Sequence, residues 1–185
     1  MPSPADRGER GTMKSRKTDT ARLARMALLT AVALTIFAAE AQIPPLVPVP
    51  GVKLGLANII TVYAMFALGP RETLAILLAR ILLGSLFAGQ MMSLLFSLAG
   101  GLLCYAAMLP LRRILTARQI WVCSVIGAVC HNIGQILVAA AVSRSLSVAV
   151  YLPVLMLSGI ISGTFTGLCA QLAVNRMGRN RPGGH

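Results

Sequence analysis

The chain has 185 residues, of which 56% are hydrophobic and 12% are charged, and its formal net charge is +12. A soluble domain carries about 25% charged residues, so this composition excludes an ordinary soluble domain and favours an integral membrane protein. The basic residues gather at the two ends of the chain, beside long apolar segments, and aromatic residues are few. This distribution is typical of membrane topology, so no nucleic-acid partner is expected.

In chain order, the sequence predicts two tails around an all-α transmembrane domain. Residues 1–21 are polar and basic, which predicts a disordered cytoplasmic tail. Residues 22–174 contain the apolar runs, and residues 175–185 form a second basic cytoplasmic tail. Because one helical span takes about 20 residues, we predict six transmembrane helices, of which the second and third are short. The six runs are 22–43, 54–68, 72–88, 91–111, 120–142 and 151–174.

The orientation follows from the distribution of Lys and Arg. With six spans, one side of the membrane holds fourteen of them, including both tails, and the other side holds Lys53 and Arg144. This asymmetry predicts a multi-pass protein of the cell membrane with both termini cytoplasmic. Alternatively, Ala39-Glu40-Ala41 is the cleavage site of a signal peptide, which would leave five spans. The first run is as long as a full span, which favours an uncleaved helix.

Strongly polar side chains lie inside several predicted spans. At about 1.5 Å per residue, those from four spans fall at similar heights in the outer half of the membrane. A carboxylate at that depth needs a partner, and Lys53 and Arg80 are the candidates for Glu40. Arg80 lies near mid-membrane, so it should face the bundle interior. We predict an outward-facing binding cavity lined by Glu40, Lys53, Asn58, Arg80, His131, Asn132 and Gln135.

Within that cavity, His131 and Gln135 are four residues apart and share one helix face, whereas Asn132 lies about 100° further around. His131 would donate or accept a hydrogen bond in its neutral form, and Lys53 would attract an anionic group of the ligand. The alternative is that these side chains, with Ser93 and Ser97, only hydrogen-bond neighbouring helices as structural contacts.

Small residues predict close helix packing. Gly159, Gly163 and Gly167 recur every four residues, and Ala27 and Ala31 form a weaker pair of the same kind in the first span. The four cysteines form no CxxC pair, so we interpret them as small apolar side chains and expect no metal site or disulfide.

Four segments together resemble a known family: PGVKLGLAN (50–58), FSLAGG (96–101), HNIGQ (131–135) and YLPVL (151–155). From about residue 24 to about residue 174 the chain resembles the heptaprenyl diphosphate synthase component I family, also called the Gx transporter family. That family is similar to the S components of energy-coupling-factor transporters, which are six-helix membrane proteins that capture a small molecule from outside. The resemblance implies an S-component-like bundle in which Ala27 and Ala31 contact a membrane coupling subunit that is driven by ATPases. Members also occur in flavin-based extracellular electron transfer systems that draw on a quinone pool.

Prenyl chain elongation needs clustered aspartates to hold Mg²⁺ on a diphosphate, whereas the aspartates here are Asp6 and Asp19, both in the tail. We therefore expect no catalytic residues and no cofactor, and at most a non-catalytic subunit of a prenyl diphosphate synthase. The leading hypothesis is the substrate-binding component of a transporter, with an unknown small-molecule substrate. One alternative is a membrane subunit whose partner is a prenyl synthase or a quinone-linked flavoprotein. Another is an assembly subunit without a ligand.

Overall fold

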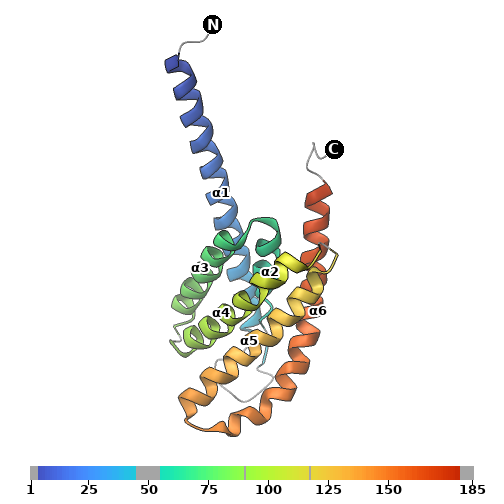
Figure 1. Cartoon of the computed structure of the whole chain (residues 1–185). Coiled ribbons are helices and arrows are strands. Elements are labelled where there is room, and N and C mark those ends of the chain that lie inside the picture. Colours follow the sequence, from blue (N-terminus) through green and yellow to red (C-terminus); the bar gives the residue numbers. More distant parts are fainter. Residues whose placement is uncertain (1–3, 45–54, 90, 117, 180–185) are drawn as a thin grey trace.

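A computed structural model describes the backbone of residues 4–44, 55–89, 91–116 and 118–179, and the side chains of residues 19–177 within those ranges. Helices make up nearly all of this part of the chain, and it contains no strand, so the predicted all-α class is confirmed. Figure 1 shows the helices in chain order: α1 (Pro4–Glu40), α2 (Asn58–Ala67), α3 (Pro70–Ala88), α4 (Met91–Ile114), α5 (Ile120–Ser143), the 3₁₀ helix η1 (Leu146–Tyr151) and α6 (Leu152–Arg179).

Four segments of the described chain are long and apolar enough to cross a membrane: Asp19–Glu40, Met91–Ile114, Ile120–Ser143 and Leu146–Met177. The other two predicted spans differ from this pattern. Helix α2 has only 10 residues, so it rises about 15 Å, half the thickness of a bilayer core. Helix α3 has 19 residues but includes Arg71, Glu72 and Arg80.

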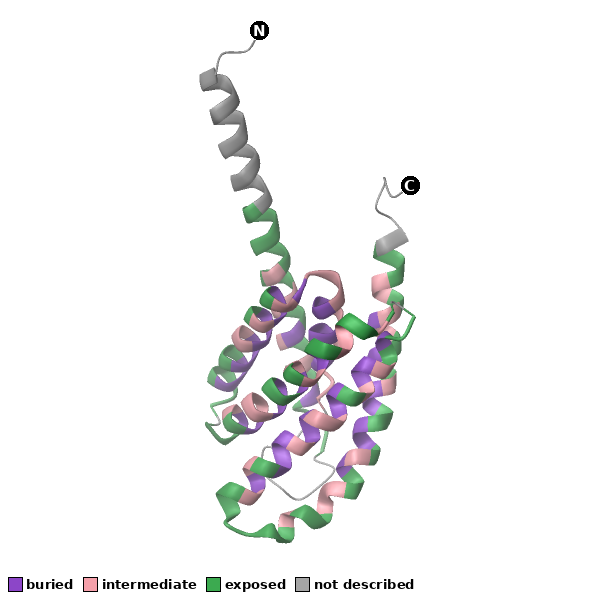
Figure 2. Ribbon diagram, viewed as in Figure 1, coloured by how far each residue is buried: buried purple, intermediate pink, exposed green. Residues whose placement is uncertain are grey.

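The helices pack as a bundle, and Figure 2 shows the buried residues mainly where the helices face one another. Helices α4, α5 and α6 pack against one another in chain order, α1 packs along α3, and α2 packs against α3 and α6. Buried Val62, Met65, Met108 and Cys123 belong to one apolar cluster, and Phe96, Ile136 and Leu155 belong to a second. Along α5, residues 131–135 therefore lie between the two apolar clusters.

Glycines bring α6 very close to α5. A Cβ atom on Gly163 would lie 2.8 Å from Val125 Cα, and one on Gly167 would lie 2.6 Å from Trp121 Cα. Because real Cβ atoms do not approach backbone this closely, only glycine permits this helix spacing. Next to the glycines, the Thr166 and Ser124 hydroxyls are 3.0 Å apart and share a hydrogen bond. The prediction of close packing along Gly159, Gly163 and Gly167 is confirmed.

Helices α1 and α3 pack side by side through a polar contact between the middle of α1 and the first turn of α3, and an aromatic contact further along both helices. Arg22 forms a salt bridge with Glu72. About 22 Å further along α1, the Phe37 ring lies against Gly84, where an added Cβ atom would be 3.1 Å from the ring. The two contacts follow each other in the same order on both helices, so α1 and α3 run parallel.

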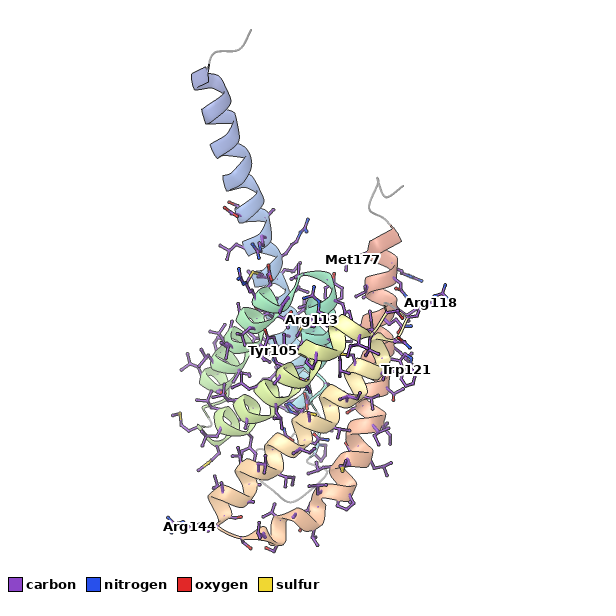
Figure 3. The ribbon with its side chains drawn as sticks, viewed as in Figure 1. Tyr105, Arg113, Arg118, Trp121, Arg144 and Met177 are labelled. Carbon is purple, nitrogen blue, oxygen red and sulfur yellow. The ribbon has the colours of Figure 1, made fainter. Side chains whose placement is uncertain are left out.

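The first turns of α1 and the last turns of α6 lie at the same end of the bundle (Figure 1). In Figure 3, Arg113, Arg118 and Met177 lie toward that end, and Arg144 lies at the opposite end, where α5 passes into η1. The Met177 sulfur accepts a hydrogen bond from the Tyr63 hydroxyl of α2 at 3.4 Å.

We expect Gly163→Ala to force α5 and α6 apart, because the new methyl group has no room beside Val125 and Ala128. Overpacking of this kind destabilises by about 1–3 kcal/mol. Thermal unfolding of the purified protein in detergent would measure the loss. The control is Leu172→Ala at an exposed position of α6, which should leave the melting temperature nearly unchanged. Equal stability of Gly163→Ala and the control would show that α5 and α6 do not need this close approach.

Candidate functional site

A small polar cavity lies inside the bundle. Its volume is about 20 Å³, which is room for about one water molecule. Its lining comes from α1, the segment before α2, and helices α3, α4 and α5: Phe37, Glu40, Gly55, Arg80, Ile81, Ser97, His131 and Gln135. Four of the residues predicted to form a binding cavity thus line a single cavity, although the predicted role of each in binding stays a prediction.

Glu40 joins the end of α1 to the segment before α2. Its carboxylate accepts a hydrogen bond of 2.5 Å from the backbone N–H of Gly55, and the side chain is buried. Gly55 has φ +78°, a backbone conformation that favours glycine. A Cβ atom there would also lie 3.0 Å from Asn58 Nδ2 and 3.3 Å from the His131 ring. Gly55 therefore lets Glu40, Asn58 and His131 meet around one backbone position.

Arg80 faces the bundle interior, as the sequence predicted, and only 6% of it is exposed. Its Nη2 atom donates a hydrogen bond of 3.3 Å to Asn58 Oδ1 on α2. The Arg80 Nε and Asn58 Nδ2 donors are buried and have no hydrogen-bond partner among the described residues. The Glu40 carboxylate interacts electrostatically with the guanidinium of Arg80. Arg80, which lines the cavity, and Asn58, which lies behind it and does not line the cavity, thus each carry one donor without a partner among the described residues.

His131 and Gln135 lie on the predicted common face of α5. Gln135 Nε2 and His131 Nε2 are 3.1 Å apart and form a hydrogen bond. The His131 ring packs against α4 at Gly100, where an added Cβ atom would lie 2.8 Å from the ring. Gly100 therefore holds the imidazole at the cavity and fixes the spacing between α4 and α5.

Asn132 is buried but does not line the cavity. Its Nδ2 atom donates a hydrogen bond of 2.5 Å to the Leu155 carbonyl on α6, next to Gly159. The side chain points toward α6 because Asn132 lies about 100° around α5 from His131. This contact matches the alternative considered for the polar residues, a hydrogen bond between neighbouring helices. Lys53, another predicted site residue, lies outside the described residues.

Four lining residues were not among those predicted to bind the ligand: Phe37, Gly55, Ile81 and Ser97. Ser97 could have been identified as a lining residue from its depth in the fourth predicted span, since it lies at a height similar to that of His131. Gly55 could have been identified from its place in the segment PGVKLGLAN, because a glycine next to predicted site residues suggests an unusual backbone conformation there. Phe37 has no such signal, because a phenylalanine in an apolar span gives no indication of what it contacts.

An apolar groove adjoins the cavity along α1 and α3. Its volume is about 480 Å³, and it is lined by Leu34, Thr35, Phe37, Ala38, Ala41, Gln42, Gly84, Phe87 and Ala88. Phe37 lines both the groove and the polar cavity. Nearer the N-terminus of α1, the predicted partner contacts Ala27 and Ala31 are exposed, as are Leu23 and Leu28 beside them.

Acidic and metal-binding residues are spread through the described part of the chain. Glu72 pairs with Arg22 near one end of the α1–α3 pair, and Glu40 lies at the cavity. Within the described residues, no group of three His, Cys, Asp or Glu side chains is placed to hold a metal ion. The four cysteines are free thiols, and Cys104 and Cys123 are buried in the first apolar cluster.

Comparison with known proteins gives one family. The sequence model described as heptaprenyl diphosphate synthase component I matches residues 29–173, which include α2 to α5, most of α6 and every cavity residue described above. No curated protein and no solved structure matches the chain.

We expect Arg80 and Glu40 to be coupled energetically. Arg80→Ala removes the hydrogen bond to Asn58 and leaves the buried Glu40 without its cation, which should cost about 3 kcal/mol. Stability would be measured for Arg80→Ala, Glu40→Ala and the double variant by thermal unfolding. Because the two charges interact, the double variant should lose less than the sum of the single losses, by about 0.5–3 kcal/mol.

Arg113→Ala is the matched control, because Arg113 is an exposed arginine on α4. It should change stability by no more than about 0.5 kcal/mol. Strictly additive losses for Arg80→Ala and Glu40→Ala would contradict the coupling.

Proposed function

The chain belongs to the heptaprenyl diphosphate synthase component I family, and from that premise we propose that it is the substrate-binding membrane component of a transporter. One observation carries this proposal: a cavity lined by Glu40, Arg80, His131 and Gln135, from three different helices, lies inside a mainly apolar bundle. Polar side chains are costly inside a membrane, and they commonly mark the path or site of a ligand. The spare donors of Arg80 and Asn58 suit a ligand with acceptor oxygens.

The cavity must widen to bind such a ligand. Small-molecule sites have volumes of about 300–1,000 Å³, far more than the 20 Å³ found here. The cavity would widen toward α1 and α3, because the groove of about 480 Å³ lies there behind the Phe37 side chain. On the other sides, Gly100 and Gly159 hold α4 and α6 close against α5.

The proposed topology is a six-helix bundle in the cell membrane with both termini in the cytoplasm. The first turns of α1 and the last turns of α6 lie at the same end of the bundle. Arg113 and Arg118 lie toward that end and Arg144 lies at the opposite end, which supports the charge asymmetry (Figure 3). In this topology α2 and α3 lie within the bilayer although α2 is short. Its polar Asn58 is covered by Arg80, so the α2 N-terminus need not contact lipid.

We further propose that the site is coupled to a membrane subunit that is driven by ATPases. The exposed Ala27 and Ala31 of α1 would provide the contact, since small residues permit a close approach of another helix. A second candidate function is favoured by the family description, which names a component of a synthase. In that case the bundle would be a membrane subunit that binds a catalytic prenyl synthase or a quinone-linked flavoprotein.

The topology is tested with reporter fusions. We expect a reporter after residue 180 to be active in the cytoplasm and one beside Ser145 to be active outside, because the Lys and Arg distribution places these positions on opposite sides. Cytoplasmic activity at Ser145 would contradict the six-helix topology. Intact-mass measurement of the mature chain would test the alternative of signal-peptide cleavage, since loss of residues 1–41 would also remove Glu40 from the cavity.

The ligand site is tested by a melting-temperature screen with vitamins, flavins, prenyl diphosphates and quinones. A true ligand at a hundred times its Kd should stabilise the protein by about 2.7 kcal/mol. His131→Ala and Gln135→Ala should abolish that stabilisation, because both residues line the cavity. Leu137→Ala is the control, since Leu137 is exposed on the same helix.

The variants also separate the site from a purely structural role. Loss of stabilisation with normal expression and folding supports a ligand site. If His131→Ala and Gln135→Ala lose expression and folding to the same extent as they lose ligand stabilisation, the two side chains serve only as contacts between helices. Binding of a prenyl synthase with no response to any ligand would favour the second candidate function.

A further inference from the structure

We propose that the ligand is a single-chain amphiphile taken from the bilayer, with its oxygen-bearing head in the polar cavity and its hydrocarbon chain in the groove between α1 and α3. This inference rests on the proposed ligand site and specifies what the site binds. The observation behind it is that the cavity and the groove share a wall, the Phe37 side chain.

The groove suits a hydrocarbon chain. Most of its lining is apolar, from Leu34, Ala38, Ala41, Phe87 and Ala88. Its volume of about 480 Å³ lies within the range of small-molecule sites. The Thr35 hydroxyl in the lining is satisfied by the Ala31 carbonyl at 3.0 Å, so it does not demand a polar partner.

The groove opens to the surface of the bundle. Ala38 and Ala88 in its lining are exposed, and the Phe87 side chain is 80% exposed. In a membrane protein, an exposed apolar surface of this kind faces lipid. A chain already in the bilayer would therefore enter from the side, between the C-terminal ends of α1 and α3, without passing through water.

Phe37 lies where the two spaces meet. Its ring rests on Gly84, which has no side chain to keep the ring in place from the α3 side. A change of the Phe37 rotamer would join the polar cavity to the groove, and a larger residue at position 84 would not leave room for the ring. The combined space would be polar at the Arg80 end and apolar along the rest.

The polar end selects for acceptor oxygens. Arg80 Nε and Asn58 Nδ2 are buried donors without a hydrogen-bond partner among the described residues. The Glu40 carboxylate already accepts a hydrogen bond from the Gly55 N–H, and it offsets part of the Arg80 charge. A head with oxygen acceptors would hydrogen-bond to Arg80 in the cavity wall, and to the adjacent Asn58 amide once the cavity widens, whereas a hydrocarbon without a head would leave these donors unsatisfied.

The test is photo-crosslinking of the full-length protein in lipid nanodiscs. The probe is hexadecyl phosphate with a diazirine in the middle of its chain, and the labelled peptides are identified by mass spectrometry. We expect saturable labelling of residues 34–42 and 84–88 that unlabelled hexadecyl phosphate displaces and inorganic phosphate does not. A diazirine-bearing hexadecane without a head should label the same helices only without saturation.

Two variants fill the groove, Ala38→Phe and Ala88→Phe, and both positions are exposed, so the fold should tolerate them. Each should raise the probe concentration for half-maximal labelling about tenfold or more, which corresponds to about 1.4 kcal/mol. The matched control is Ala106→Phe, at an exposed alanine of α4 away from the groove. Melting temperatures of all three variants would confirm that they fold.

Saturable labelling that is weakened by both groove variants and unchanged in Ala106→Phe supports the inference. Labelling without saturation, or saturable labelling that the groove variants leave unchanged, overturns it. If a water-soluble compound from the melting screen stabilises the protein through His131 and Gln135 while hexadecyl phosphate does not label saturably, the ligand site stands and the amphiphile is excluded. If neither compound binds, the ligand site itself fails.

Discussion

The backbone N–H of Gly55, hydrogen-bonded to the buried Glu40 carboxylate, joins the last turn of α1 to the start of α2. In the interior of a membrane no water is available to satisfy a carboxylate or a free N–H, so such groups must find partners within the protein. The same requirement accounts for the pairing of Arg80 with Asn58 and of His131 with Gln135. Each polar group holds another in place, and the cavity forms where these pairs from different helices meet. The bundle could bury these side chains separately only by leaving each of them without a partner.

Much of the fold and part of the site could be predicted from the sequence. The depth of a residue in its span follows from counting residues, and this placed Glu40, His131 and Gln135 at similar heights and Arg80 near mid-membrane, facing the interior. All four line the cavity. The direction of a side chain around a helix depends on which neighbours pack against it, which one sequence does not reveal. Asn132 therefore points to α6 and the Leu155 carbonyl, although it is adjacent to His131 in sequence. The glycines of α6 were predictable as packing residues because their spacing of four leaves one face of the helix flat.

The lengths of the middle helices were less predictable. Hydrophobicity suggested a span from residue 54 to residue 68, whereas α2 begins only at Asn58, because Gly55 adopts a left-handed backbone conformation before it. An apolar run records which residues avoid water, and it does not distinguish helix from an irregular segment covered by protein. In the same way, the size of the cavity depends on side-chain packing, in particular on where the Phe37 ring lies. Neither the point at which α2 begins nor the size of the cavity leaves a periodic signal in the sequence.

The glycine contacts make α4, α5 and α6 a more rigid part of the bundle than α1 and α3. Where Gly100, Gly134, Gly163 and Gly167 bring the backbones of α4, α5 and α6 together, little sliding is possible without a clash. Helices α1 and α3 meet instead through the Arg22–Glu72 pair and the Phe37 ring, with a groove beside them. We therefore expect the α1–α3 pair to be the compliant side of the protein. A thinner bilayer, or a change in lateral pressure, would be accommodated by tilting these two helices, so the lipid composition around the protein would itself adjust how widely the groove opens.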